Sequence, residues 1–261
     1  MMMKKYIPVL LLLLPLAACH KPAADPVPQK DVAFVSIRSF ETKAQIGTNN
    51  LPAWSQGDQI AVVGADTDNP SVFTLHSGAG YSVASFEGEK PEGDKYVICY
   101  PADARCDGET FRGTLGTRVS HGVPFHPLAN LPLWGHAEDL SSVSLSSPCG
   151  ILKLNLRGGG KLKSITLDAG KPVSGEFMYN IPANLFAMIG GATIITMDTS
   201  GTELLPTRDV PFYFILPPGE YDELVLNVTD ADDDVTYIPV DDTVVIESGF
   251  FSPLSIDLSA I

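Results

Sequence analysis

The second half of the chain carries the clearest alternation of apolar and polar positions. In residues 152–157, leucines at 152, 154 and 156 alternate with Lys153, Asn155 and Arg157, which places the leucines on one face of a strand. Comparable short runs follow at residues 165–167, 173–178, 193–197, 210–216, 224–229, 236–240, 243–247 and 254–258. Short strands at this spacing are typical of a β-sandwich with Greek-key connections.

The first half is predicted to contain strands as well. Residues 33–40 alternate in the same way, and Gly- or Pro-containing turns separate further short runs at residues 59–64, 71–76, 81–86, 95–100 and 131–136. Trp54 precedes a turn at Gly57 and is expected to cap the core. Residues 102–130 have weak periodicity and are predicted to form a long loop or small insertion. The best helical candidate, residues 181–189, is short.

These patterns predict an all-β protein with two consecutive Greek-key β-sandwich domains. The length remaining after a signal segment is comfortable for two domains with separate cores. We expect a lipoprotein signal peptide at 1–18, a tether at 19–31, an N-terminal domain at 32–138 and a C-terminal domain at 139–261. The tether contains prolines at 22, 26 and 28, which favour a stiff, extended segment.

The N-terminus looks like an export signal. Lys4 and Lys5 precede an apolar run, and Leu16-Ala-Ala leads directly into Cys19. This ending resembles the bacterial lipoprotein signal, which implies that Cys19 becomes the first mature residue and carries lipid (palmitate among its acyl chains). The alternatives are an ordinary signal peptide with a chance cysteine, or an anchor helix, although the run is short for a membrane span.

The charge balance excludes some partners. Asp and Glu number 31 against 17 Lys and Arg, which gives a formal net charge of −14. Such a chain repels nucleic acid and anionic headgroups, so we expect no nucleic-acid partner. Attachment to a membrane would therefore depend on lipid rather than on a basic patch.

Three further cysteines, Cys99, Cys106 and Cys149, remain besides Cys19. A compartment reached by export permits disulfides, so Cys99 and Cys106 can form a local bridge across the Pro101 turn. All three can equally be small apolar core residues. The absence of a C-x-x-C pair gives a structural zinc site no support.

Other candidate chemistry is weak, and we expect no catalytic, cofactor or metal site. His121, His126 and His136 lie in or near a turn-rich stretch, where solvated loop histidines are favoured over metal ligands. The acidic residues Asp230, Asp232, Asp233 and Asp234 lack the glycine and distant glutamate of a calcium loop, so a hairpin turn is favoured, as it is for Asp66 and Asp68. The nucleophile elbow G-x-S-x-G and phosphate-binding loops do not occur.

The order of several short motifs resembles a known family. In the first half these motifs are Thr42-Lys-Ala, Trp54 with Gly-Asp-Gln-Ile at 57–60, Ala-Ser-Phe-Glu-Gly at 84–88 and residues 96–101. In the second half they are Leu-Lys-Leu-Asn-Leu at 152–156, Phe-Ile-Leu-Pro-Pro at 214–218, Tyr221 and Ile-Glu-Ser-Gly at 246–249. Together with the lipobox, this series resembles the Bacteroidales fimbrillin-like lipoproteins over nearly all of the mature chain.

The resemblance implies two transthyretin-like β-sandwiches and a role in fimbriae on the outer membrane. In assembling members, a trypsin-like protease removes the first strand, and a strand of the next subunit fills the groove by β-augmentation. Here the removable strand would be residues 33–40. Cleavage would fall at Arg38, which lies inside that predicted strand, or at Lys43, which lies in the link after it.

The end of the sequence bears on the role within a fimbrium. Residues 254–258 are expected to be the last strand of the second domain, and only three residues follow, so no strand remains to donate. We therefore expect a lipid-anchored tip or accessory subunit, or an adhesin, at the cell surface or in a fimbrium. Its partners would be other fimbrial subunits and a host or bacterial receptor. The alternative function is a surface glycan-binding lipoprotein; a hydrolase is disfavoured.

Overall fold

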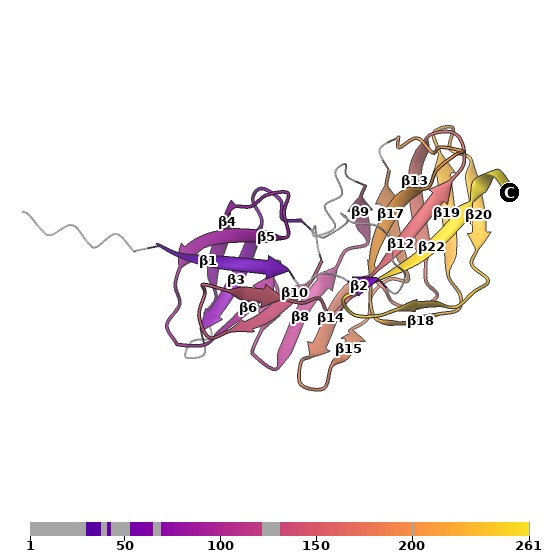
Figure 1. Ribbon diagram of the computed structural model, residues 1–261. Helices are drawn as coiled ribbons and strands as arrows, with labels where there is room; N and C mark the ends of the chain where they lie inside the picture. Colours follow the sequence, from indigo (N-terminus) through magenta and orange to yellow (C-terminus); the bar gives the residue numbers. More distant parts are fainter. Residues whose placement is uncertain are drawn as a thin grey trace, which may run out of the picture.

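The computed structural model describes residues 30–37, 41–42, 53–64, 69–121, 131–199 and 201–260. Within these residues the chain forms strands β1 to β22 and one short 3-10 turn, η1 (Leu258–Ala260). The strands build two lobes that lie end to end (Figure 1). The all-β fold class predicted from the alternating pattern is confirmed.

The first lobe is built on one seven-stranded sheet in the order β10-β6-β3-β4-β5-β1-β11. Its strands are β1 (Lys30–Ile37), β3 (Gln59–Gly64), β4 (Ser71–Ser77), β5 (Val83–Glu89), β6 (Tyr96–Tyr100), β10 (Leu133–Ala137) and β11 (Val143–Leu145). Trp134 and Ser146 exchange backbone hydrogen bonds of 3.0 and 2.9 Å between the two end strands. The sheet therefore closes around its own core.

Trp54, which the sequence predicted to cap the core, is buried within it. Its indole is fully buried and contacts Phe86 and Tyr100 edge to face, with ring centroids 4.8 and 5.3 Å away. Gly57 follows with φ of 90°, a conformation that L side chains rarely adopt, which explains the glycine in this turn.

The second lobe is a two-layer sandwich. One layer has the order β17-β12-β22-β2, with β17 (Val210–Leu216), β12 (Gly150–Arg157), β22 (Phe250–Asp257) and β2 (Glu41–Thr42). The other has the order β20-β19-β13-β16-β9, with β20 (Val235–Pro239), β19 (Val225–Asp230), β13 (Leu162–Asp168), β16 (Ile194–Asp198) and β9 (Arg118–Ser120). The leucines at 152, 154 and 156 share one fully buried face, as predicted, and belong to the core between these layers.

Strands from the first half of the chain also enter sheets of the second half. β7 (Arg105–Cys106) and β8 (Thr110–Leu115) join β14 (Gly175–Asn180) and β15 (Leu185–Met188) in the order β15-β14-β8-β7. The predicted loop at 102–130 was thus wrong for residues 105–106, 110–115 and 118–120. The division at residue 138 stays a prediction, and strands from both sides of it share sheets.

The helical candidate at 181–189 was also wrong, because β15 occupies residues 185–188 and pairs with β14. A tight turn joins the two strands. Asn184 has φ of 52°, its side chain accepts a hydrogen bond of 2.7 Å from the Tyr179 hydroxyl, and Asn180 accepts one of 2.8 Å from the Ala183 N–H. These side-chain contacts favour a hairpin over a helix.

The two lobes are packed against each other rather than merely linked. Ile151, Tyr213 and Phe251 project from the layer that contains β12 and belong to the hydrophobic core of the first lobe. The remaining strands, β18 (Gly219–Tyr221) and β21 (Val244–Ile246), form a small sheet below the sandwich (Figure 1). A membrane-crossing helix, judged by length and apolar character, is not found in the described part of the chain.

Candidate strand-exchange site

β1 is an interior strand that has a different kind of neighbour on each side. It pairs antiparallel with β5 over seven register positions, from Lys30 opposite Glu89 to Ser36 opposite Val83. On its other side it pairs parallel with β11 from residue 35 to residue 37. The Phe34 N–H also donates a hydrogen bond of 2.9 Å to the carbonyl oxygen of Leu140. Loss of β1 would therefore expose two strand edges at once.

The strand begins three residues earlier than the predicted range of 33–40. Lys30 and Asp31 continue the antiparallel ladder opposite Glu89 and Gly88, although their polar side chains break the apolar alternation. Backbone pairing extends this strand where the side-chain pattern gives no signal. Residues 38–40 lie outside the described residues.

The inward side chains that the structure describes in β1 are small. Ala33 and Val35 are fully buried in the first-lobe core, between the residues of β5 and β11. These two side chains bury much less apolar area than the leucine side chains of the second-lobe core do. Backbone hydrogen bonds, worth about 0.5–1.5 kcal/mol each, therefore supply a large part of the docking energy of β1.

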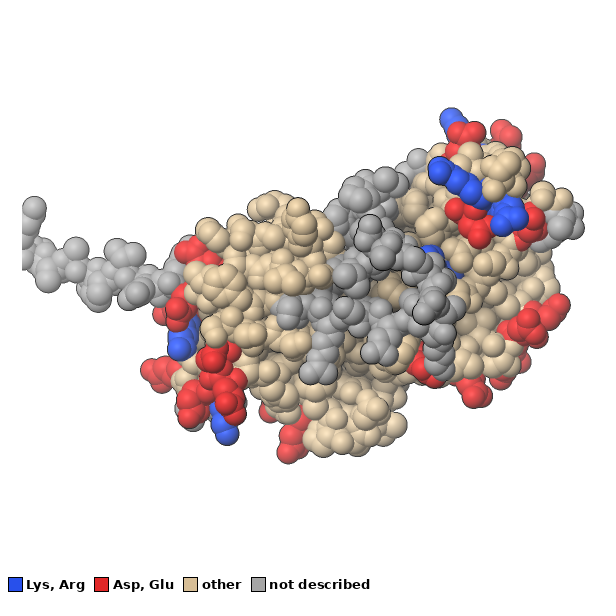
Figure 2. Space-filling model, viewed as in Figure 1, with Lys and Arg blue, Asp and Glu red and all other residues tan. Residues whose placement is uncertain are grey.

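The outward face of β1 is apolar as well. Phe34 is 54% exposed and Val32 is 40% exposed, and Val83 of the neighbouring β5 is 60% exposed. Figure 2 shows a broad surface with few charged side chains over this part of the first lobe, while acidic residues gather at its lower rim. Single exposed apolar residues are ordinary on a protein surface, so this face adds context to the strand but defines no ligand.

The candidate processing and lipidation residues have different relations to this strand. Cys19, Arg38 and Lys43 lie outside the described residues. The connectivity is nevertheless clear, because Arg38 follows β1 directly and Lys43 follows β2 directly. β2 pairs parallel with β22, Glu41 opposite Phe250 and Thr42 opposite Phe251. A cut after Arg38 would leave β2 on the protein, whereas a cut after Lys43 would detach β2 together with β1.

β22 is the last described strand and is an integral part of the sandwich. It begins at Phe250, four residues before the predicted start, and pairs parallel with β12 from residue 251 to residue 257. Ser252 and Ser248 add side-chain bonds to the carbonyl oxygens of Val245 and Pro148, at 2.6 and 2.8 Å. These contacts tie β22 to its own sandwich.

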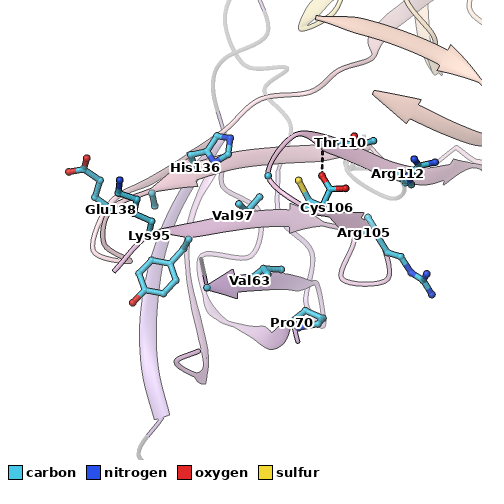
Figure 3. A pocket seen from close by; sticks show the side chains of 16 residues that line it. Val63, Pro70, Lys95, Val97, Arg105, Cys106, Thr110, Arg112, His136 and Glu138 are labelled. Carbon is cyan, nitrogen blue, oxygen red and sulfur yellow. Dashed lines mark hydrogen bonds between the residues drawn. The ribbon is translucent and has the colours of Figure 1, made fainter. Parts of the chain in front are cut away.

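A cavity of about 1120 Å³ lies beside the first-lobe sheet, outside its closed core. Val63 of β3 and Val97 of β6 line one side, and Cys106 of β7 lies among the residues of the opposite hairpin (Figure 3). Charged side chains surround these apolar residues, namely Lys95, Arg105, Asp107, Arg112 and Glu138, together with His136. Both signs of charge occur, so the lining selects no charge class of ligand.

The three cysteines share the small core between this sheet and the β7–β8 hairpin, with Phe111 and Phe177 beside them. All three are free, and Cys149 is fully buried. Burial raises the pKa of the Cys149 thiol. The Cys99 and Cys106 thiols lie beside each other, and each shifts the pKa of the other. The sequence left the bridge and the core alternatives open, and the structure brings these two thiols into contact.

The residues weighed as metal ligands are distributed as follows. His121 lies against the ring of Phe212, with ring centroids 4.7 Å apart, and burial lowers its pKa. His136 lines the cavity, while His126, Asp66 and Asp68 lie outside the described residues. In the described part of the chain, groups of three or more His, Cys, Asp or Glu residues that could hold a metal ion do not occur.

The acidic cluster at 230–234 forms a hairpin turn, as predicted. Asp230 accepts backbone hydrogen bonds from Asp232 and Asp234 at 2.9 and 3.0 Å, and β19 and β20 pair on either side. Asp233 has φ of 69° and forms an ion pair with Lys163. The Asp230 carboxylate is thus used within the turn, and the Asp233 carboxylate pairs with a neighbouring strand.

No protein-family model and no curated protein matches the chain. Among solved structures, a candidate cell adhesion protein from Bacteroides ovatus is similar over 88% of this chain and 92% of its own, with a TM-score of 0.57 and 13% identity. A second, from Bacteroides uniformis, has a TM-score of 0.49 at 12% identity over 87% and 93% of the two chains. A fimbrial assembly protein from Parabacteroides distasonis has a TM-score of 0.38 at 13% identity over 87% and 91%.

The first of these comparisons defines the class of fold: a two-lobed all-β protein that matches along almost the whole of both chains. The solved structure that shares this fold, from Bacteroides ovatus, is a cell adhesion candidate from the Bacteroidales, the group whose fimbrillin-like lipoproteins the sequence resembles. The fold that this resemblance implied is therefore confirmed.

Proposed function

We propose that this chain is a lipid-anchored fimbrial accessory or tip subunit, or an adhesin, that joins other subunits by strand complementation. The observation that carries the proposal is the position of β1. This strand lies between two others and contributes small buried side chains, so a substitute strand could take its place without repacking large groups. The fold shared with a candidate cell adhesion protein supports the same role.

The anchor is part of the proposal. Cys19 follows Leu16-Ala-Ala, and the described strands begin only at Lys30, so about ten tether residues would separate lipid from the folded body. Two acyl signals on one residue give stable anchoring where a single chain does not. We propose attachment to the outer membrane, with the body at the cell surface or in a fimbrium.

We propose a binding role rather than catalysis. The one thiol that lines the cavity, Cys106, lies beside the Cys99 thiol, and Cys99 and the Gly108 N–H both lower its pKa. A catalytic cysteine is commonly activated by an adjacent base such as histidine, and the groups that shift the pKa of Cys106 include no histidine. Strand edges and loops would therefore be the working surfaces, and other fimbrial subunits and a host or bacterial receptor the partners.

Limited proteolysis of the folded full chain tests strand exchange. An arginine-specific protease is expected to cut after Arg38, which lies between β1 and β2, and a lysine-specific protease after Lys43, which lies between β2 and β3. After the cut, a labelled peptide of residues 30–37 should bind the protein, while uncut protein should not bind it. Fluorescence anisotropy measures the binding, and N-terminal sequencing identifies the cut.

A matched peptide makes this experiment specific. Replacement of Val35 in the peptide by Asp places a carboxylate in the core position and should abolish binding, whereas replacement of the outward Phe34 by Ser should not. Equal binding of both altered peptides, or binding to uncut protein, would contradict strand exchange. Cys19→Ala tests the anchor separately, since it should abolish palmitate labelling and membrane association and leave peptide binding intact.

A further inference from the structure

Cys99 and Cys106 are placed together by the alternation of β6. In that strand Ile98 and Tyr100 point into the first-lobe core, so Cys99 between them points outward, toward the β7–β8 hairpin. Cys106 is the second residue of β7, and its register partner in β8 is Phe111. The chain turns back within seven residues, which brings the two side chains into one buried cluster.

The two thiols differ in access. Cys99 is fully buried and lies between Ala61 and Trp134 in the sheet register. Cys106 is 9% exposed and lines the cavity, where Figure 3 shows it among the other lining residues. A small oxidant that enters the cavity therefore reaches Cys106 first. Cys149, in the same core cluster, is fully buried and has no thiol among the groups that shift its pKa.

We propose that Cys99 and Cys106 form a disulfide that fastens the β7–β8 hairpin to the first-lobe sheet. The oxidant is a disulfide, either of a thiol oxidoreductase or of glutathione. The Cys106 thiolate attacks it to give a mixed disulfide and one released thiol, and the Cys99 thiolate then displaces the second thiol. Two S–H bonds break, one S–S bond forms, and the two electrons and two protons reduce the oxidant to two thiols.

The acidities of the thiols fit this order. The hydrogen bond from Cys99 lowers the pKa of Cys106, and the Gly108 N–H acts in the same direction. The same contact with Cys106, followed by burial, raises the pKa of Cys99. Cys106, which lines the cavity, is thus the better thiolate and the attacking group, and the fully buried Cys99 acts second.

The disulfide would have a consequence beyond its own hairpin. β8 pairs with β14 over six register positions, from Thr110 opposite Asn180 to Leu115 opposite Gly175. The bond would hold β7 against β6, and the β8–β14 ladder would carry that restraint into the second half of the chain. This inference does not depend on strand exchange or on the lipid anchor.

Tryptic mapping of the full chain tests the proposal, because Arg105 separates the two cysteines into different peptides. The protein is equilibrated with glutathione disulfide, alkylated with iodoacetamide under denaturing conditions without reductant, and digested. We expect peptides 96–105 and 106–112 to appear linked and to separate on reduction, while Cys149 in peptide 119–153 is alkylated. Recovery of both short peptides in alkylated form, or of either linked to peptide 119–153, would overturn the proposal.

Single-cysteine variants test the order of attack. Cys99→Ser should accumulate a glutathione adduct on peptide 106–112. Cys106→Ser, by contrast, should leave peptide 96–105 free of glutathione when the folded protein is treated. Cys149→Ser is the matched control and should keep the linked pair. If a variant fails to fold, the wild-type protein still gives a second readout. Its oxidised form should melt about 5 °C above its reduced form, and equal melting temperatures would count against the restraint.

Discussion

β1 and β12 occupy equivalent places in the two lobes and differ in what they bury. Each has an antiparallel neighbour, β5 or β17, and a parallel neighbour, β11 or β22. β12 pairs over seven positions on both sides, whereas β1 has only three described pairs on its parallel side. The leucines of β12 fill one core and Ile151 reaches into the other, while β1 buries Ala33 and Val35. The same arrangement of neighbours thus surrounds a strand with large buried side chains and a strand whose described buried side chains are small.

The largest expected effect falls on β12. Leu154→Ala should lower the free energy of unfolding by about 2–5 kcal/mol, because it removes a fully buried side chain from the centre of the sandwich. Asn155→Ala on the opposite face is the control and should cost about 0.5 kcal/mol or less. Urea denaturation measures both. Similar costs for the two variants would remove the energetic basis of the comparison.

The corresponding change in β1 should cost less. Val35→Ala removes two methyl groups from the first-lobe core, which corresponds to about 2 kcal/mol. Phe34→Ala alters an exposed residue of the same strand and should change stability by about 0.5 kcal/mol or less. Urea denaturation measures these variants as well, and comparison with the β12 variants shows which strand contributes more to the free energy of unfolding. A larger loss for Val35→Ala than for Leu154→Ala would reverse the comparison.

Local opening should separate the two strands without any mutation. Amide hydrogens of β1 are expected to exchange about tenfold faster, or more, than those of β12, because fewer apolar contacts hold β1 in place. Native-state hydrogen exchange read by mass spectrometry can follow peptides that contain each strand. Equal protection would indicate that backbone pairing alone holds β1 as firmly as the leucines hold β12.

The smallest expected effect concerns pH and the second lobe. Burial against Phe212 lowers the pKa of His121, so the unfolded state takes up a proton at a higher pH than the folded state does. The contribution of neutral His121 to stability is therefore present above its unfolded pKa of about 6.5 and is lost as pH falls below that value. The free energy of unfolding should therefore be lower at pH 5 than at pH 7.5, and His121→Phe should make this difference smaller. If the variant leaves this difference unchanged, the pH dependence of stability arises from other groups.

The sequence predicted most strands whose side chains alternate. β3 at 59–64 and β17 at 210–216 match their predicted ranges, since apolar residues and bounding turns mark both. β15 was missed although it pairs locally with β14, whereas other missed strands have partners far away in the chain. β8 pairs with β14, and β9 pairs parallel with β16, so the stretch at 102–121 takes its structure from residues that local periodicity does not reveal.

The candidate site was foreseen in part. The family resemblance singled out the first strand, and the structure places that strand between β5 and β11, which no local pattern could indicate. The polar residues Lys30 and Asp31 hid the true start of β1. The proximity of Cys99 and Cys106 followed from their spacing across a turn, but their contact depends on Cys99 facing away from the main core.

The ladder between β8 and β14 has a mechanical consequence. The lobes are joined by this ladder and by the buried Ile151, Tyr213 and Phe251. The molecule should therefore respond to tension as one rigid body rather than as two independently moving lobes. In a fibre or on a tethered cell, a pull on one end would load six rows of backbone pairing together before either lobe could swing away. In the proposed fimbrial role, the protein would transmit force with little stretch.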